Sequence, residues 1–194
     1  MAKLNAVAVT GNLTNPSKTV LLAKEILSAL EASREFEARL IDLSQRTSAL
    51  AGVVRREDAS VEVQQDLKAV ENADVVVAVT PVYRGSFTGV FKRFFDLIEQ
   101  DSLQEVPVIL AATGGGHRHT LVVEHSLRPL FAFFEAHTVP TAIYAGGTDF
   151  DTERRLSAEV QKRVRSAARQ AVGLLSPRPV LRSTGQLHSL RAPV

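Results

Sequence analysis

Residues 75–80 read Val-Val-Val-Ala-Val-Thr, an uninterrupted run of mostly β-branched side chains. A strand with one face in water would carry a polar residue at every second position, so this run is typical of a central strand covered on both faces. Strands of that kind belong to parallel sheets with helices on each side. This one segment therefore restricts the chain to the α/β class.

The rest of the chain alternates strand-length apolar runs with segments of helical spacing. The predicted strands are 4–10, 36–42, 75–80, 106–113 and one around 141–144. The predicted helices are 18–33, 61–72, 88–99, about 117–136 and about 152–175, with a long loop over 49–60. Five strands with intervening helices fit the flavodoxin-like sheet order 2-1-3-4-5 or a truncated Rossmann order. Either order gathers the functional loops at the carboxyl ends of the strands.

Composition narrows the possible chemistry. The chain has 194 residues, of which 45% are hydrophobic and 23% charged, as expected of one globular domain. It has no apolar run of membrane-spanning length and no signal-peptide layout at its start, so a cytoplasmic protein without a membrane partner is expected. The chain has no cysteine. Any redox chemistry must therefore come from a cofactor.

The positive charge is concentrated near the carboxyl end. Residues 176–194 carry Arg178, Arg182 and Arg191 and no acidic residue, and the remainder has 20 basic against 21 acidic side chains. A nearly neutral body argues against nucleic acid as a partner, since such binding needs clustered Lys and Arg. We expect a domain over 1–175 and a basic, Pro- and Ser-containing tail over 176–194, either disordered or lying against a partner.

The loop at residues 10–19 joins the first strand to the first helix. A helix amino terminus offers unpaired N–H groups and the positive end of the helix dipole, so a phosphate is stabilised there, and the hydroxyls of Ser17 and Thr19 add donors. The loop is no Walker P-loop, because Ser17 stands where glycine precedes the lysine, and Gly11 is its one glycine. The alternative is that Ser17 or Thr19 only caps the helix.

Two further loops favour the ligand-binding interpretation. After the third predicted strand comes Pro81-Val82-Tyr83-Arg84-Gly85-Ser86, in which Pro81 stiffens the chain and Tyr83 offers a ring to a planar ligand. After the fourth comes Thr113-Gly114-Gly115-Gly116, where glycine lets backbone N–H groups approach a ligand. Three such loops at one sheet edge are hard to explain as ordinary turns.

These motifs, in this order and spacing, resemble the NAD(P)H-dependent FMN reductases of the flavodoxin-like superfamily, over roughly residues 4–175. The resemblance implies a three-layer sandwich with a five-stranded parallel sheet of order 2-1-3-4-5. Within that family the chain looks most like the sulfonate-desulfonation-linked reductases, which supply reduced FMN to a separate monooxygenase. It implies that Ser17, Lys18 and Thr19 hold the FMN phosphate. The remaining implied contacts are to the ribityl chain and ring from Pro81, Val82, Tyr83 and Arg84, and to the isoalloxazine border from Thr113, Gly114 and Gly115.

One departure concerns charge. Many relatives have an arginine inside the phosphate loop, where this chain has Leu13-Thr14. Charge compensation would then fall to Lys18, and FMN is expected to be held only moderately.

A proline marks the predicted fourth helix. Pro129 cannot donate to the carbonyl of His125, so the helix must kink there or widen into a π-bulge, and π-bulges often lie at functional sites. The sulfonate-linked reductases resemble this, since an inserted residue gives them a π-helix near the flavin and a subunit interface. We expect His125 to occupy that position and to tune flavin exchange, the alternative being a histidine at a kink with no role.

Other clusters carry weaker interpretations. His117, His119 and His125 invite a metal site, but residues two apart on a helix point to different faces, so no metal is expected. The acidic residues Asp149, Asp151 and Glu153 are typical of a solvated turn and helix start.

The predicted chemistry is hydride transfer from NADH or NADPH to FMN, which requires no catalytic acid or base because the cofactor carries the reaction. Arg84 or Arg118 is a candidate for positioning the phosphates of the nicotinamide nucleotide. Alternatives are a flavin-bound quinone or azo reductase, a flavodoxin-type electron carrier and a non-enzymatic flavin-binding subunit. A homodimer or homotetramer is expected, because one helix face cannot bury Phe91, Phe94, Phe95, Phe131, Phe133 and Phe134.

Overall fold

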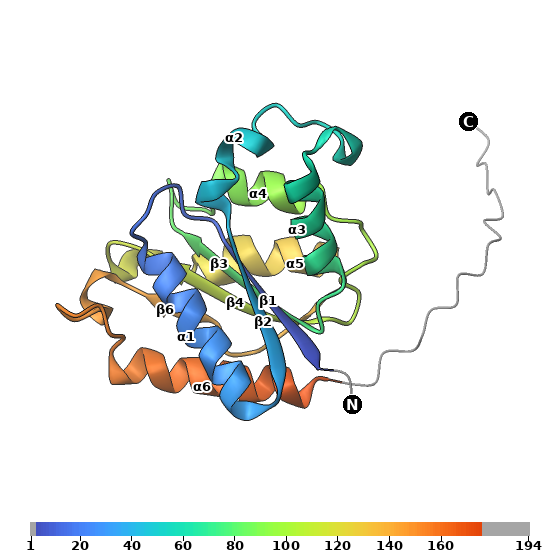
Figure 1. Ribbon diagram of the computed structural model, residues 1–194. Coiled ribbons are helices and arrows are strands. Elements are labelled where there is room, and N and C mark those ends of the chain that lie inside the picture. The colour runs from blue at the N-terminus through green and yellow to red at the C-terminus, as the bar shows by residue number, and fades with distance from the viewer. Residues whose placement is uncertain (1–2, 176–194) are drawn as a thin grey trace, which may run out of the picture.

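The computed structural model describes residues 3–175, which form a parallel sheet between two layers of helices (Figure 1). The sheet order is β2-β1-β3-β4-β5, so the flavodoxin-like order is confirmed over the Rossmann alternative. The strands in that order are β2 (Phe36–Asp42), β1 (Leu4–Thr10), β3 (Val75–Pro81), β4 (Pro107–Thr113) and β5 (His137–Thr138). The first two strands pair in register from Leu4 with Phe36 to Thr10 with Asp42.

The last position of the sheet is filled by two short strands. β5 pairs with the start of β4, His137 lying opposite Pro107, and β6 (Ile143–Ala145) pairs with its end. The segment between them contains Pro140, which has no N–H to donate to β4. The single strand expected around 141–144 is thus two strands beside the same neighbour.

Two hydrophobic cores explain the pattern of β3. Val75, Val77 and Val79 face α1 (Lys18–Ser33) and α6 (Ala158–Gly173). Val76 and Ala78 face the opposite layer, which contains α3 (Val61–Glu71), α4 (Gly89–Phe95) and α5 (Arg128–Phe133). Both faces of β3 are buried, which is why its sequence shows no alternation.

The prediction of one long helix over 117–136 was wrong. The chain instead forms a 3-10 turn at His117–His119, a π-helix at Val123–Leu127 and then α5. Pro129 lacks the N–H that would bond to His125, and the N–H of Arg128 donates five residues back to the carbonyl of Val123. Of the two outcomes considered, the π-helix is the observed one.

Other helix boundaries differ more modestly from expectation. α6 begins at Ala158 rather than near 152, because Ser157 caps it and Asp151 binds the backbone N–H groups of Glu153 and Arg155 in a separate turn. α4 ends at Phe95 instead of 99. The expected loop over 49–60 contains the end of a short helix, α2 (Thr47–Leu50), and a 3-10 turn at Arg56–Asp58.

Most of the phenylalanines are buried within the chain. Phe91, Phe94, Phe95, Phe131 and Phe134 pack into the core beneath α4 and α5, whereas Phe133 is 63% exposed. The premise that these rings exceed what the chain can bury was therefore wrong for all but Phe133, because α4 and α5 lie side by side and bury each other's rings. Within residues 3–175, no helix is long and apolar enough to cross a membrane.

Candidate flavin site

The loops after β1, β3 and β4 meet at one edge of the sheet and bond to one another (Figure 1). The N–H of Gly11 donates to the carbonyl of Val79 at 2.9 Å, and the N–H of Val82 donates to the carbonyl of Thr113 at 2.7 Å. The hydroxyls of Thr19 and Thr113 lie 2.8 Å apart in a buried hydrogen bond. The structure thus brings together the three loops in which the sequence predicts site residues.

Ser17 caps α1, since its hydroxyl oxygen accepts from the N–H of Thr19 at 3.1 Å. The cap does not exclude an anion, because the Ser17 hydroxyl proton stays free to donate and the first turn of the helix retains unpaired N–H groups. Gly11 is required by close packing, because a Cβ there would lie 2.9 Å from the side chain of Phe91. Asn12 is buried, and its Oδ1 has no hydrogen-bond partner among the described residues.

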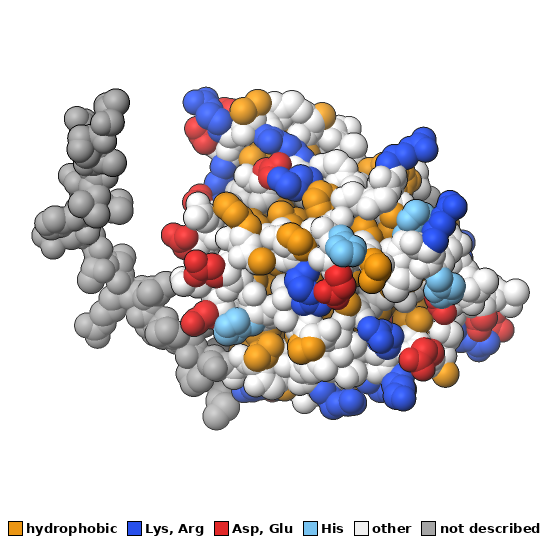
Figure 2. All heavy atoms as spheres, turned by 180° about the vertical axis from the view of Figure 1, so that it is seen from behind, with side chains coloured by type: hydrophobic (Ala, Val, Ile, Leu, Met, Phe, Trp, Pro, Cys, Tyr) orange, Lys and Arg blue, Asp and Glu red, His pale blue; other side chains and the backbone are white. Residues whose placement is uncertain are grey.

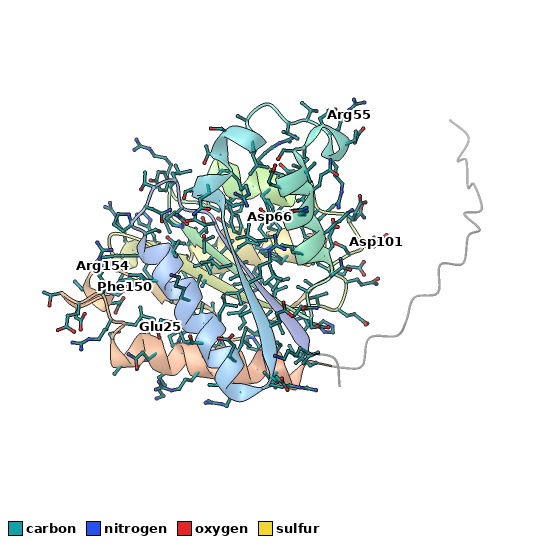
Figure 3. The ribbon with its side chains drawn as sticks, viewed as in Figure 1. Glu25, Arg55, Asp66, Asp101, Phe150 and Arg154 are labelled. Carbon is teal, nitrogen blue, oxygen red and sulfur yellow. The ribbon has the colours of Figure 1, made fainter. Side chains whose placement is uncertain are left out.

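Lys18 lies in an unexpected direction. Its ammonium group donates to the carbonyl of Gly147 at 3.2 Å and stands 5.0 Å from the centre of the Phe150 ring. Figure 3 shows Phe150 beside the amino end of α1. The lysine side chain therefore binds the segment after β6 through one hydrogen bond and one cation–π contact.

The loop after β3 ends in a tight turn. Tyr83 and Ser86 exchange backbone hydrogen bonds of 2.8 and 3.0 Å, and Arg84 and Gly85 have φ of 49° and 84°. Two positive φ values are characteristic of a type I′ turn, for which glycine is favoured. Tyr83 is 49% exposed and Arg84 is exposed at the tip, so both side chains are accessible to a ligand at this edge.

The loop after β4 is held by Tyr144 of β6. The Tyr144 hydroxyl donates to the carbonyl of Gly116 at 2.5 Å, and the N–H of Gly114 donates to the carbonyl of Ala145 at 3.1 Å. A Cβ on Gly114 would lie 2.3 Å from the Tyr144 hydroxyl, so any larger residue there would displace the tyrosine hydroxyl or the loop. Burial, and then the charge of Asp149, raise the pKa of Tyr144. The phenol therefore remains a donor at neutral pH.

The segment after β6 was missed as part of the site. Gly146 donates its N–H to Asp149 at 2.7 Å, and a Cβ on Gly147 would lie 3.1 Å from the carbonyl of Gly115. Asp149, expected in a solvated turn, has a side chain only 18% exposed and lies 3.8 Å from His117. Gly146 and Gly147 directly follow a strand, as Gly114 and Gly115 do after β4, and this shared pattern could have indicated the segment from the sequence.

Of the three candidate histidines, His117 directly follows the loop after β4 and its ring centre lies 6.2 Å from that of Tyr144. Arg118 is exposed and its Nε donates to His119 at 3.2 Å, and His125 is exposed within the π-helix. Across residues 3–175, no group of three or more His, Asp or Glu side chains is arranged to hold a metal ion.

Arg128, the first residue of α5, joins the π-helix to the sheet by bonding to both. Arg128 donates from Nε and Nη2 to the carboxylate of Glu124 at 2.6 and 2.9 Å. Its third nitrogen donates to the hydroxyl of Thr138 at 2.8 Å and to the carbonyl of Val139 at 3.2 Å. The Arg128 guanidinium lowers the pKa of Glu124 below its ordinary value, first through its hydrogen bonds to the Glu124 carboxylate and then through its charge.

Comparison with known proteins shows the family to which the chain belongs. The profile of the family described as NADPH-dependent FMN reductase matches residues 4–151. The chain belongs to this family. An NADH-dependent FMN reductase, SfnE, of Pseudomonas putida is 44% identical over 93% of this chain and 97% of its own length. An FMN reductase (NADPH) of Pseudomonas aeruginosa is 42% identical over 90% and 94%.

A solved structure of another FMN reductase shows the same architecture. The apo form of the NADH:FMN oxidoreductase EmoB superposes with a TM-score of 0.82 at 25% identity, covering 91% of this chain and 92% of that one. The chain therefore spans nearly the full length of these three proteins, and the family match over residues 4–151 includes all three loops.

The residues at this edge fit FMN. A Cβ placed on Gly115 would meet no atom within 4 Å, so the loop after β4 has open space beside it for a planar ring. The buried Asn12 Oδ1 can accept a hydrogen bond from a hydroxyl or a protonated phosphate oxygen. In sheets of this order FMN binds at the switch point between β1 and β3, which is where these loops meet.

Proposed function

We propose that this protein binds FMN and a reduced nicotinamide nucleotide at the loops after β1, β3 and β4, transfers a hydride between them and releases reduced FMN. The observation that carries the proposal is the bonding of the three loops into one edge, with Thr19 and Thr113 joined directly. Membership of the FMN reductase family supports the reaction. The alternative function, a flavodoxin-type electron carrier, would need a site for FMN but none for a nicotinamide nucleotide.

The proposed roles follow the geometry. The FMN phosphate is bound by the hydroxyl of Ser17 and by backbone N–H groups of the first turn of α1, that of Lys18 included, and Thr19 holds this turn in place through its buried hydrogen bond to Thr113. Pro81, Val82, Tyr83 and Arg84 line the ribityl chain and one side of the ring, and Thr113, Gly114 and Gly115 border the other side. Bound FMN supplies the hydride acceptor, so the side chains only align two rings and exclude water. Arg84 or Arg118 is proposed to position the phosphates of the nicotinamide nucleotide.

A direct assay tests the reaction. Purified protein is mixed with NADH or NADPH, with and without FMN, and the nicotinamide absorbance is followed. The expected result is oxidation that depends on FMN, with one nucleotide preferred. Oxidation that proceeds at the same rate without added FMN, in protein free of flavin, would contradict the proposal, as would no oxidation at all.

We further propose that reduced FMN passes to a separate monooxygenase and that the protein acts as a homodimer or homotetramer in the cytoplasm. Support for self-association comes from two exposed apolar side chains, one before and one after the π-helix in the sequence. Leu121 is 62% exposed and Phe133 is 63% exposed. Figure 2 shows hydrophobic side chains exposed on the face that is seen from behind. Light scattering of the protein and of Phe133→Ser tests this, and a monomer in both would overturn it.

A further inference from the structure

Asp42, the last residue of β2, accepts three hydrogen bonds, two of them from the loop between β1 and α1. Its Oδ1 accepts from Asn12 Nδ2 at 3.0 Å and from the N–H of Ser44 at 3.0 Å. Its Oδ2 accepts from Asn15 Nδ2 at 2.8 Å. Asn12 and Asn15 flank residues 13–14, so a single carboxylate fixes both arms of the loop to the neighbouring strand.

The carboxylate itself stands on a rigid support. Asp42 pairs in register with Thr10 at the end of the sheet. The buried Asp66 of α3, labelled in Figure 3, accepts from Arg39 at 2.5 Å and from Arg46 at 2.8 Å. This pair of ion bridges ties β2 and the segment after it to α3, so residues 39–46 are held on both sides of Asp42.

The charge of Asp42 cannot be what helps a phosphate to bind. Like charges repel, and residues 11–17 contain no basic side chain to offset the carboxylate. The ammonium group of Lys18 is directed to Gly147 instead. Any favourable effect of Asp42 on phosphate binding must therefore come through the shape of the loop that it holds.

We propose that Asp42 is a positioning residue that keeps loop 11–17 in the conformation that binds the FMN phosphate, and that it thereby sets the preference for FMN over riboflavin. Riboflavin is the same flavin without the phosphate, so its binding depends on the loops after β3 and β4 and not on this one. The inference rests on the proposed function, in which loop 11–17 and the start of α1 receive the phosphate.

Asp42→Asn is the decisive variant because it changes almost no volume. An amide has one acceptor oxygen, so in either orientation its NH₂ group faces the NH₂ group of Asn12 or of Asn15, and one arm of the loop is released. Dissociation constants for FMN and riboflavin are measured by quenching of flavin fluorescence. We expect weaker FMN binding by about tenfold, the typical effect of losing a hydrogen bond to a charged group, and riboflavin binding within about twofold of the unaltered protein. The KM for FMN should rise while kcat changes little.

A matched control is available at the other end of the sheet. Asp74 accepts from the N–H of Asn5 at 2.7 Å, far from the loops of the site, so Asp74→Asn should leave both constants unchanged. Ser44→Ala is a milder test from outside the loop, because the Ser44 hydroxyl accepts from Asn15 Nδ2 at 2.9 Å. It should weaken FMN binding by about two- to threefold without affecting riboflavin.

The outcomes separate the two proposals. If the unaltered protein binds FMN no more tightly than riboflavin, the assignment of the phosphate to this loop fails. If it prefers FMN and Asp42→Asn and Ser44→Ala keep that preference, the role of Asp42 fails while the site stands. Equal weakening of both flavins in Asp42→Asn, with no effect of Ser44→Ala, indicates a general structural role and likewise overturns the inference.

Discussion

The hydroxyls of Thr19 and Thr113, 94 residues apart in the chain, form a buried hydrogen bond of 2.8 Å between the start of α1 and the end of β4. One residue belongs to the predicted phosphate loop and the other to the predicted isoalloxazine border. Their contact fixes the spacing between the two parts of the site.

Replacing either threonine by valine should therefore destabilise the fold. Thr19→Val or Thr113→Val keeps the shape but leaves the other hydroxyl buried without its partner, which costs about 1–3 kcal/mol in the free energy of unfolding. The double variant should cost less than the sum of the two, because both unpaired groups are then removed. Urea unfolding measures all four proteins, and strict additivity would show that the hydrogen bond does not couple the loops.

Gly114→Ala should lower the FMN-dependent rate by about tenfold or more. The added methyl group would lie 2.3 Å from the Tyr144 hydroxyl, so either the loop after β4 or the tyrosine must move, and both shifts disturb the hydrogen bond from Tyr144 to Gly116 that holds the loop; small displacements at a reacting centre are costly. Gly89→Ala is the control, since a Cβ there meets nothing within 4 Å. The assay is nicotinamide oxidation at saturating FMN. A Gly114→Ala protein as active as Gly89→Ala would show that the loop position does not matter.

Acid should weaken the fastening of the π-helix. The pKa of Glu124 is lowered in the folded protein by Arg128, so the pair contributes stability that is present above the ordinary value of 4.5 and is lost as the pH falls through the lowered one. The effect is under about 1 kcal/mol because the carboxylate is partly exposed. Thermal unfolding of the protein and of Glu124→Gln should differ near neutral pH and converge in acid. A difference that does not depend on pH would argue against the ion pair.

Deletion of His125 tests the proposed role of the π-helix in flavin exchange. Without the extra residue the segment can form regular α-helical hydrogen bonds up to Pro129, and a more regular helix should exchange flavin more slowly. We expect FMN to co-purify with the deletion variant and turnover with free FMN to fall by about tenfold. His125→Ala separates the side chain from the spacing, because it preserves residue number. Unchanged flavin retention and turnover in both variants would show that His125 has no such role.

The local sequence pattern was sufficient to predict those strands and helices whose own residues show a clear periodicity. β1, α1 and β2 have the predicted bounds, because burial on one or two faces imposes a periodicity that a short window reveals. The loops at Gly11, Pro81 and Thr113 were predictable for a similar reason, since the carboxyl ends of parallel strands must share one edge.

Only the tertiary structure decided which side chains contact those loops. The lysine expected to face the phosphate reaches Gly147, Asp42 ties down Asn12 and Asn15, and Tyr144 clamps Gly114, all through contacts between segments far apart in the chain. The break at Pro129 was visible in the sequence. The choice of a π-helix over a kink, and the burial of five phenylalanines between α4 and α5, were not, because packing against neighbouring elements leaves no trace in local periodicity. The sequence by itself determined the class of fold, most of its strands and helices and the sheet edge at which the predicted site residues gather, and long-range packing determined the side-chain contacts that shape that edge.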